Sequence, residues 1–333
     1  MSALDLSIVI PLFNEDESLP ELTDWISRVM DREGYTYEIV FVNDGSTDNS
    51  WQVIQELRTK NENVKAISFR RNQGKSAGLN QGFKAASGQV VITMDADLQD
   101  SPEEIPELRR MILEDGYDLV SGWKQKRYDP ITKTLPTKLF NAATRRISKI
   151  KLNDFNCGLK AYRLEVVHNI EVYGEMHRYI PFLAKNKGFG KIGEKVVQHQ
   201  ARKYGTTKFG LNRFINGFLD LATLGVMGKF GRRPMHFFGA AGTLMFTLSI
   251  ALLAYLGGYK FWALSAGVEA RLITENPLFY ILLALTIMGV QLFGVGFIAE
   301  SLLRESNKKH DYTINDKIGL DQWPHLPLHQ SMR

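Results

Sequence analysis

The sequence predicts an α/β domain built on a mostly parallel sheet, followed by amphipathic helices and two transmembrane helices. Three observations favour this fold class. Strand-like and helix-like segments alternate through about the first 125 residues, the pattern of a sheet covered by helices. The strand-like segment at 90–94 is apolar on both faces, as in a buried parallel strand. Two long segments, 235–258 and 277–299, contain no Asp, Glu, Lys or Arg.

The net charge and the cysteine content of the chain indicate which kinds of partner and compartment it is suited to. The chain has 333 residues and a formal net charge of +5, which favours anionic partners such as nucleic acid, lipid headgroups or phosphorylated substrates. Its single cysteine, Cys157, rules out an intramolecular disulfide and a zinc-binding cysteine cluster. One free thiol fits a reducing compartment for the soluble part of the chain.

The predicted strands of the first domain end in polar loops. We expect strands at 6–10, 38–42, 64–69, 90–94 and 118–122, with helices between them. Four of these strands run into loops rich in Asp, Asn, Gly, Lys and Arg. Because the carboxyl ends of parallel strands meet at one edge of a sheet, where open α/β sheets bind ligands, the loops should form one site.

Two carboxylates follow the central strand. Asp95 and Asp97 are one residue apart, so on an extended chain their side chains point the same way. With Gln99 as a third oxygen ligand, they suit Mg²⁺ or Mn²⁺ whose remaining positions are filled by substrate phosphate. The same spacing also fits a solvated acidic loop in which Asp97 caps the next helix.

The alternation ends after Gly122, and basic amphipathic segments follow. A helix is expected at about 136–151, with apolar residues on one side and cations on the other. A second one is expected within 206–232, after the basic loop 202–208. Each fits a helix lying on a membrane surface, and the first equally fits a core helix with a solvated cationic face.

The two apolar segments are long enough to cross a bilayer. Spans are expected at about 235–258 and 277–300, at 1.5 Å per residue across a hydrocarbon core of about 30 Å. Arg and Lys residues flank both outer ends, so the positive-inside rule puts the large domain in the cytoplasm. The expected organisation is a cytoplasmic domain at 1–205, an amphipathic juxtamembrane helix at 206–232, a transmembrane hairpin at 233–303 and a polar tail at 304–333.

Six short segments together carry a family resemblance. In order they read PLFNE at 11–15, NDGSTD at 43–48, NQGK at 72–75, DADLQ at 95–99, DFNCGLKAYR at 154–163 and RKYGTTK at 202–208. The chain resembles glycosyltransferase family 2, and the last two segments resemble its polyprenyl-phosphate branch. That branch includes dolichyl-phosphate mannose synthases and bacterial undecaprenyl-phosphate glucosyltransferases, and the resemblance covers roughly the first 300 residues.

The resemblance implies a GT-A fold and a metal-dependent hexosyltransferase of the bacterial inner membrane. The implied reaction is inverting transfer of a sugar from a nucleotide-sugar to the phosphate of a polyprenyl phosphate, undecaprenyl phosphate in bacteria. The bacterial likeness favours a UDP-sugar over GDP-mannose. The lipid-linked product would serve glycan or lipid modification of the cell envelope. The amphipathic helices and spans could also support a homo-oligomer.

The family resemblance also implies roles for individual residues of this chain, at the positions that match the family's motifs. Asp95, Asp97 and Gln99 would hold the metal, and Asp154 would lie near the sugar. The nucleoside pocket would comprise Pro11, Phe13, Glu15 and Asp44, with Lys75 reaching a phosphate. Phe13 replaces the usual Tyr and lacks its hydroxyl. Cations must bring the anionic acceptor to its anionic donor, and the candidates are Lys124, Arg127, Arg202 and Lys208.

Each of these residues also has an ordinary structural reading. Asp44 could cap a helix, Phe13 could pack in the core, and the cations could be solvated surface charges. Two other functions fit the same motifs: a processive polysaccharide synthase, and a nucleotide-sugar sensor without turnover. No tryptophan follows an arginine, so the Gln-x-x-Arg-Trp element of processive synthases is missing. Nucleic-acid binding is disfavoured because the basic loops accompany carboxylates and no recognition module is present.

Overall fold

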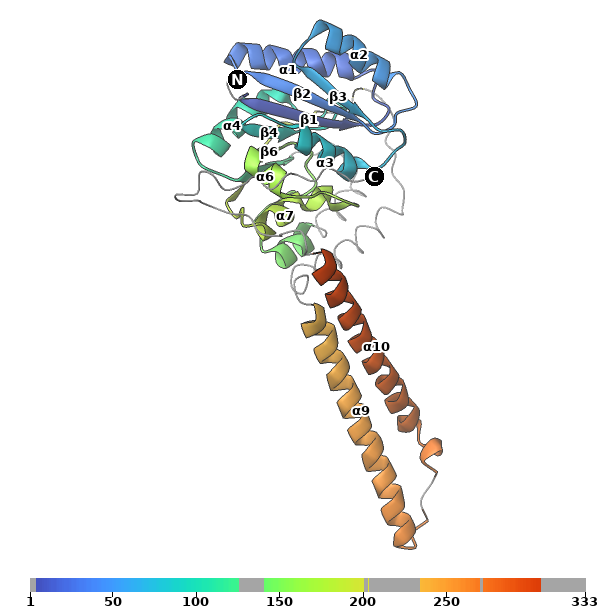
Figure 1. The fold of residues 1–333 in the computed structure, drawn as a ribbon. Helices are drawn as coiled ribbons and strands as arrows, with labels where there is room; N and C mark the ends of the chain where they lie inside the picture. Colours follow the sequence, from blue (N-terminus) through green and yellow to red (C-terminus); the bar gives the residue numbers. More distant parts are fainter. Residues whose placement is uncertain (1–3, 126–140, 201–202, 204–233, 270–271, 307–333) are drawn as a thin grey trace, which may run out of the picture.

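The computed structural model describes residues 4–125, 141–200, 203, 234–269 and 272–306. Figure 1 shows an α/β domain from which a two-helix hairpin projects. Every expected strand is present, within two residues of its predicted bounds.

The first half of the domain is a parallel sheet with helical crossovers. Strands β1, β2, β3 and β4 all run in one direction, in the order β3-β2-β1-β4. The crossovers are α1, α2 and α3, as the alternation predicts. The bounds are β1 Leu6–Leu12, α1 Leu19–Glu33, β2 Tyr37–Asn43, α2 Ser50–Lys60, β3 Val64–Ser68, α3 Lys75–Ala85 and β4 Val90–Thr93.

The second half extends the sheet and inserts one antiparallel strand. The full order is β3-β2-β1-β4-β6-β5-β7, with β6 antiparallel to β4 and β5. Lys160 of β6 therefore lies opposite Thr93 at the end of β4. The bounds are η1 Pro102–Glu104, α4 Ile105–Leu113, β5 Leu119–Trp123, β6 Lys160–Arg163, α6 Leu164–Asn169, η2 Met176–Tyr179, α7 Ile180–Asn186 and β7 Ile192–Val196.

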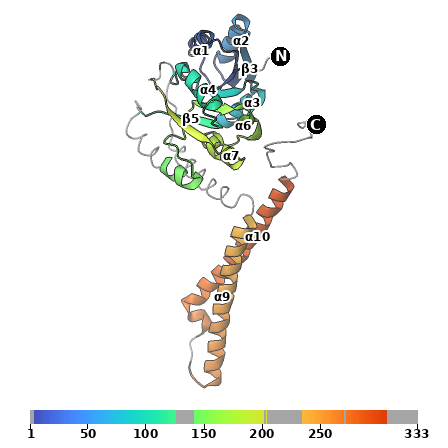
Figure 2. The ribbon, with the colours of Figure 1, turned by 90° about the vertical axis from the view of Figure 1, so that its left-hand side faces the viewer.

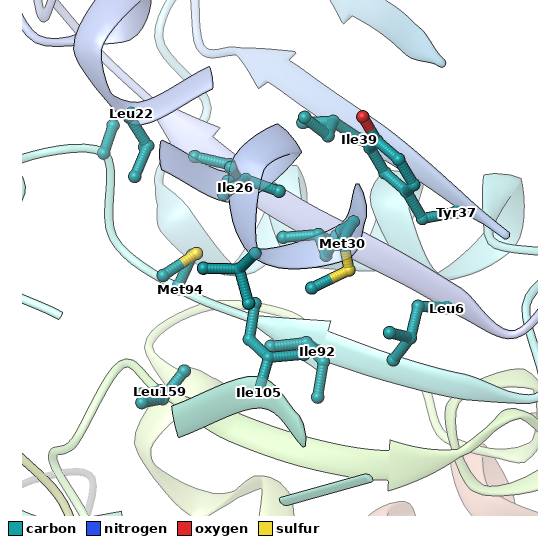
Figure 3. Packing of buried hydrophobic residues seen from close by; sticks show 14 of the residues in the cluster. Leu6, Leu22, Ile26, Met30, Tyr37, Ile39, Ile92, Met94, Ile105 and Leu159 are labelled. Carbon is teal, nitrogen blue, oxygen red and sulfur yellow. The ribbon is translucent and has the colours of Figure 1, made fainter. Parts of the chain in front are cut away.

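Two apolar layers hold the helices on the sheet. Figure 3 shows Ile26 and Met30 of α1 and Ile105 of α4 against Ile39 and Ile92 of the strands. The opposite face carries a second layer, built from α3, α6 and α7. Fully burying one such side chain contributes about 1.5–3 kcal/mol, so the layers fix the strands from which the site loops emerge.

A helix at 141–148 buries its polar face. Asn141, Thr144 and Ser148 are buried against the domain, whereas Ile147 is exposed. The Asn141 amide donates to the carbonyl oxygen of Asn153 at 2.9 Å. Of the expected apolar face, Ile147 is exposed and Ala143 is partly buried, whereas Ile150, just beyond the helix, is buried in the core. The helix ends at residue 148, before the expected 151, and residues 136–140 lie outside the described residues.

Two long helices form the hairpin. Helix α9 (Pro234–Ser265) and helix α10 (Pro277–Ser306) lie side by side in Figures 1 and 2, with η3 (Ile273–Glu275) between them in sequence. Both are long and apolar enough to cross a membrane, judged by length and composition. Each extends beyond its predicted span, α9 to Ser265 and α10 to Ser306, because the helical backbone continues past the apolar stretch.

Glycines and hydroxyls hold the hairpin together. A Cβ added to Gly289 would lie 2.8 Å from the carbonyl oxygen of Gly242, so the two backbones pass in direct contact. The Thr286 hydroxyl donates to Ser249 Oγ across the interface at 2.9 Å. Close backbone approach at small residues and interhelical hydrogen bonds are the usual means of packing helices in a membrane.

Candidate functional site

The candidate site lies where β1, β2 and β4 end and the antiparallel strand β6 begins. Asp95 is the second residue after β4, and its carboxylate is ion-paired with the ammonium of Lys75, the first residue of α3. A Cβ on Gly158 would lie 2.5 Å from Asp95 Oδ2, so the start of β6 packs directly against this carboxylate. Residues 75, 95 and 158 thus meet at one point.

Asp95 is held in its ionised form. Burial raises the pKa of the carboxyl, but the positive charges of Lys75, Lys124 and Lys160 outweigh burial and lower it below its usual range. A carboxylate that stays ionised among cations is a hard anionic oxygen ligand.

The loop after Asp95 has a strained backbone. Leu98 has φ 62°, a left-handed conformation that is uncommon for a bulky residue, and its side chain is buried in the core. The Gln99 N–H donates to Asp97 Oδ1 at 3.2 Å, which closes the loop locally. The buried Leu98 side chain anchors the loop, and the side chains of Asp97 and Gln99 on either side remain partly exposed.

These three side chains suit a divalent cation that is shared with a substrate. No group of three or more His, Cys, Asp or Glu side chains in the described part of the chain could enclose a metal ion. Two carboxylates and an amide oxygen are too few for a closed site, and Mg²⁺ or Mn²⁺ bound there would complete its shell with water and phosphate oxygens. The residues present therefore fit the predicted metal.

Lys124 occupies a buried ion pair. Its ammonium lies 2.8 Å from Asp100 Oδ1, and the side chain of Asp100 is fully buried. Burial lowers the pKa of Lys124, but Asp100 and the neighbouring acidic groups raise it above its usual range. Asp100 also accepts a long hydrogen bond from the Asp95 N–H at 3.4 Å. Lys124 thus braces the loop of Asp95, and a direct contact with an acceptor phosphate stays a prediction.

The segment that leads to the basic loop 202–208 contacts the site at residues 99–100. The Gln200 N–H donates to the Gln99 carbonyl oxygen at 3.0 Å, and His199 forms a β-bridge with Asp100. Lys203 is ion-paired with Glu21 at 2.7 Å. The predicted site residues Arg127, Arg202 and Lys208 lie outside the described residues.

On the nucleoside side, Asp44 organises the loop before α3. Its two carboxylate oxygens accept the N–H groups of Gln73 at 2.6 Å and Gly74 at 2.9 Å. The neighbouring Gly45 has φ 69°, and a Cβ there would lie 2.5 Å from the Arg71 backbone. Asp44 therefore sets the position of Lys75, and its predicted contact with a base stays a prediction.

The end of β1 forms the other wall of this side. Pro11 lines a small cavity together with Lys75, whereas Phe13 is only partly buried. The Glu15 N–H donates to Ser50 Oγ at 3.0 Å, which ties this loop to the start of α2. The structure thus brings the predicted nucleoside residues to one edge of the sheet beside Asp95.

Asp154 is buried in the loop before β6. Its carboxylate accepts the N–H of Asn156 at 3.0 Å, and its own N–H donates to Glu194 at 2.9 Å. Burial, with help from Asp154, raises the pKa of Glu194. These contacts fix Asp154, and its predicted role near the sugar stays a prediction.

Three residues that line the cavity are not predicted from the sequence as site residues. Lys160, His177 and Arg178 line the same cavity as Lys75 and Asp95, a space of about 20 Å³ that could hold one water. Lys160 belongs to the family-like segment 154–163, but that resemblance implies no role for it. His177 and Arg178 lie in η2, whose sequence has no periodic pattern. Only the tertiary fold brings residues 75 and 178 together.

Comparison with known proteins gives consistent similarities. Residues 7–171 match the family described as Glycosyl transferase family 2. The chain is 32% identical over 307 residues to the dodecaprenyl-phosphate galacturonate synthase of Rhizobium johnstonii, covering 91% of this chain and 89% of the relative. It is 36% identical over 277 residues to the undecaprenyl-phosphate 4-deoxy-4-formamido-L-arabinose transferase of Pseudomonas fluorescens, covering 76% and 80%.

Solved structures share the fold of the domain. Glucosyl-3-phosphoglycerate synthase of Mycobacterium tuberculosis, in complex with Mn²⁺ and UDP-glucose, matches with a TM-score of 0.51 and 21% identity, covering 68% of this chain and 79% of the other. A complex of the same enzyme with Mn²⁺, UDP and product matches with a TM-score of 0.51 and 19% identity, covering 68% and 80%. At this identity the likeness establishes the arrangement of sheet and helices alone.

Proposed function

Because the chain belongs to glycosyltransferase family 2, with polyprenyl-phosphate glycosyltransferases as its relatives, we propose that it makes a polyprenyl-phosphate sugar. The enzyme transfers a sugar from a nucleotide-sugar to the phosphate of a membrane polyprenyl phosphate. The donor is a UDP-sugar and the acceptor is undecaprenyl phosphate. The single observation that carries this proposal is the ion pair between Asp95 and Lys75 at the end of β4, in a chain with a two-helix hairpin.

The donor diphosphate is held at this point. Asp95, Asp97 and Gln99 would hold Mg²⁺ or Mn²⁺, and the bound ion would supply neutralisation of the charge that grows on the leaving nucleotide. Lys75 exchanges Asp95 for a phosphate oxygen when the donor binds. Asp44 fixes Lys75 through the loop at 73–74 and contacts the base, with Pro11, Phe13 and Glu15 completing the nucleoside pocket.

The acceptor is its own nucleophile. A phosphate monoester has a second pKa of about 6, so it is largely a dianion at neutral pH and needs no strong general base. Arg127, Arg202 and Lys208 position it, with Lys124 bracing the loop beside it. Asp154 orients the sugar hydroxyls.

Single displacement inverts the anomeric centre. Cys157 is a poor candidate for a covalent intermediate, because burial raises the pKa of its thiol to about 12 and keeps it protonated. Direct attack by the lipid phosphate therefore accounts for the reaction.

The membrane places the lipid substrate next to this site. The hairpin spans the bacterial inner membrane as a multi-pass anchor, and the domain stays in the cytoplasm. The side of the helix at 141–148 that carries the exposed Ile147 lies against the lipid surface. The domain limits 1–205, 206–232, 233–303 and 304–333 follow from this arrangement, and the spans support a homo-oligomer.

Sugar transfer in detergent tests the proposal. Full-length protein is supplied with undecaprenyl phosphate, a panel of labelled nucleotide-sugars and Mn²⁺ or Mg²⁺. A labelled, chloroform-soluble product that disappears on addition of EDTA is expected, and the active donor names the sugar. Nucleotide binding without lipid product in any combination would contradict the function and point to a polymer synthase or a sensor.

The metal ligands can be tested separately. We expect Asp95→Ala and Asp97→Ala each to lower transfer by roughly 100-fold or more, since each removes charge stabilisation in the transition state. The matched control is Asp24→Ala on the exposed face of α1. Circular dichroism and membrane fractionation should show folded, membrane-bound protein in all three variants. Full activity in either site variant would refute the metal assignment.

A further inference from the structure

A hydrogen-bonded clip joins α3 to η2 beside the metal ligands. The backbone N–H of His177 donates to Ser76 Oγ at 3.1 Å, and Ser76 Oγ lies 3.2 Å from Nδ1 of the same histidine. Ser76 is buried, and 101 residues separate it from His177. Ser76 follows Lys75 and His177 precedes Arg178, so the clip fixes these two cations on one cavity.

The cavity carries excess positive charge. Lys75, Lys160 and Arg178 line it, and Asp95 is the only carboxylate that lines it among the described residues. Burial is the largest cause that lowers the pKa of His177, and the nearby charges of Lys75, Arg178 and Lys160 lower it further. His177 is therefore neutral at pH 7, and two positive charges remain without an opposite partner.

Arg178 is the cation available to a ligand. The ammonium of Lys160 donates to the carbonyl oxygen of Cys157, and Lys75 is paired with Asp95. In the described part of the structure, the guanidinium of Arg178 has neither a hydrogen bond nor an ion pair, although its side chain is partly buried. A guanidinium in this position can bind two oxygens of one phosphate group at once.

The residues that line the cavity indicate whether Arg178 binds the donor diphosphate or the acceptor phosphate. Pro11 of β1 and Leu79 of α3 belong to the elements that carry the nucleoside residues, and Asp95 is the metal ligand. Resting on the proposed function, we propose that Arg178 binds the diphosphate of the nucleotide-sugar at the rim of this cavity, whose interior has room only for a water, and that the Ser76–His177 clip positions the guanidinium. Arg178 then stabilises the negative charge of the leaving nucleotide.

Nucleotide binding without turnover tests the inference. Full-length protein in detergent with Mn²⁺ is titrated with UDP and with uridine, or with GDP and guanosine if the wild type prefers them. Hydrogen bonds to charged groups contribute roughly 1.5–3 kcal/mol, so Arg178→Ala should weaken diphosphate binding roughly 10- to 100-fold. Binding of the nucleoside alone should not change.

Three further variants test whether the loss of binding comes from the guanidinium of Arg178 and from its positioning. Arg178→Lys should bind the diphosphate with intermediate affinity, because an ammonium cannot form the bidentate contact. Ser76→Ala should weaken it less than Arg178→Ala does and leave the nucleoside affinity intact. Arg28→Ala, on the exposed face of α1, is the matched control and should behave as wild type.

The possible results separate this inference from the proposed function. Unchanged diphosphate affinity in Arg178→Ala, with wild-type transfer still present, would refute the inference alone. Unchanged diphosphate affinity with a raised KM for undecaprenyl phosphate would assign Arg178 to the acceptor and overturn its donor role. A wild-type protein that binds neither nucleotide and makes no lipid product would overturn both proposals.

Discussion

At the scale of single residues, the site depends on backbone positions as much as on charges. Leu98 holds a left-handed conformation between Asp97 and Gln99, with its side chain anchored in the core. Gly158 leaves room for the Asp95 carboxylate, because any side chain at that position would overlap it. Two apolar residues thus position the side chains that we propose as metal ligands.

Gly158→Ala should therefore damage metal binding without unfolding the protein. The new Cβ would lie 2.5 Å from Asp95 Oδ2, and the carboxylate at the end of a side chain moves more easily than the backbone. Misplacing a ligand in this way should weaken Mn²⁺-dependent UDP binding roughly 10- to 100-fold. The melting temperature should stay close to that of the wild type.

A Mn²⁺ titration of UDP binding, with thermal melting in parallel, measures both effects. Gly190→Ala is the control, since no atom lies within 4 Å of its added Cβ. An unchanged Mn²⁺ requirement in Gly158→Ala would show that Asp95 tolerates displacement.

Sequence patterns can locate side chains only where their signal is local. Asp95 and Asp97 follow an apolar strand at a spacing of two, and this pattern is complete within ten residues. The partner of Lys124 is different, because Asp100 reaches it only when β4 and β5 are placed on either side of β6. Arg178 is further removed, since a contact over 101 residues positions its neighbour. Motif spacing contains no information about such pairings.

At the scale of elements, the antiparallel strand β6 explains why the site has two sides. Strands that run parallel to β4 begin at the far edge of the sheet, whereas β6 begins beside the end of β4. Residues 157–160 therefore face Asp95 across the site. The direction of β6 depends on packing between neighbouring strands, which an alternation pattern does not describe.

The hairpin offers an element-scale test. Gly289→Leu should separate α9 from α10, because its Cβ would meet the Gly242 carbonyl oxygen at 2.8 Å and the Phe246 nitrogen at 2.9 Å. Backbone atoms cannot move aside as a flexible side chain can. Gly294→Leu is the matched control on the same helix, with nothing within 4 Å.

Disulfide cross-linking in membranes measures the separation. With Ser249→Cys and Thr286→Cys in one chain, the two sulfurs replace hydroxyls that lie 2.9 Å apart and should cross-link readily. Adding Gly289→Leu should lower the yield severalfold, and adding Gly294→Leu should not. Equal yields in both would show that these helices do not pack through Gly242 and Gly289.

At the scale of the whole molecule, the carboxyl and amino ends of the strands form two different edges of the sheet, one at the candidate site and one stabilised by a buried polar network. The carboxyl edge holds the site, and the amino edge holds a buried network around Glu38. The Glu38 carboxylate accepts hydrogen bonds from Ser7 at 2.5 Å and from Ser87 at 2.8 Å, and it pairs with Lys65 at 2.5 Å. These partners come from β1, β3 and the turn before β4, so one carboxylate ties four strands together.

Glu38→Gln should lower stability and change its pH dependence. Burial raises the pKa of this carboxyl, but Lys65 and the serine hydrogen bonds lower it overall below its usual value. Its stabilising effect is therefore present above the unfolded-state pKa of about 4.3 and is lost as the pH falls below that value. At pH 7 the variant should lose about 1–3 kcal/mol of unfolding free energy.

Thermal melting at pH 7 and at pH 4 checks this. The difference between wild type and variant should shrink at the lower pH, and activity per folded molecule should be unchanged because the site is at the other edge. Glu56→Gln on the exposed face of α2 is the control. A difference that grows on acidification would contradict the assigned direction of the pKa shift.

The bridge between Asp100 and His199 has a consequence for biosynthesis. Every strand of the described sheet, and the bridge partner of the loop at 95–100, has been translated once Gln200 is added to the chain. The first hairpin helix begins only at Pro234, 34 residues after Gln200. At roughly 5–20 residues per second, that separation lasts roughly two to seven seconds. The ribosome therefore completes the described sheet before it begins the first helix of the hairpin.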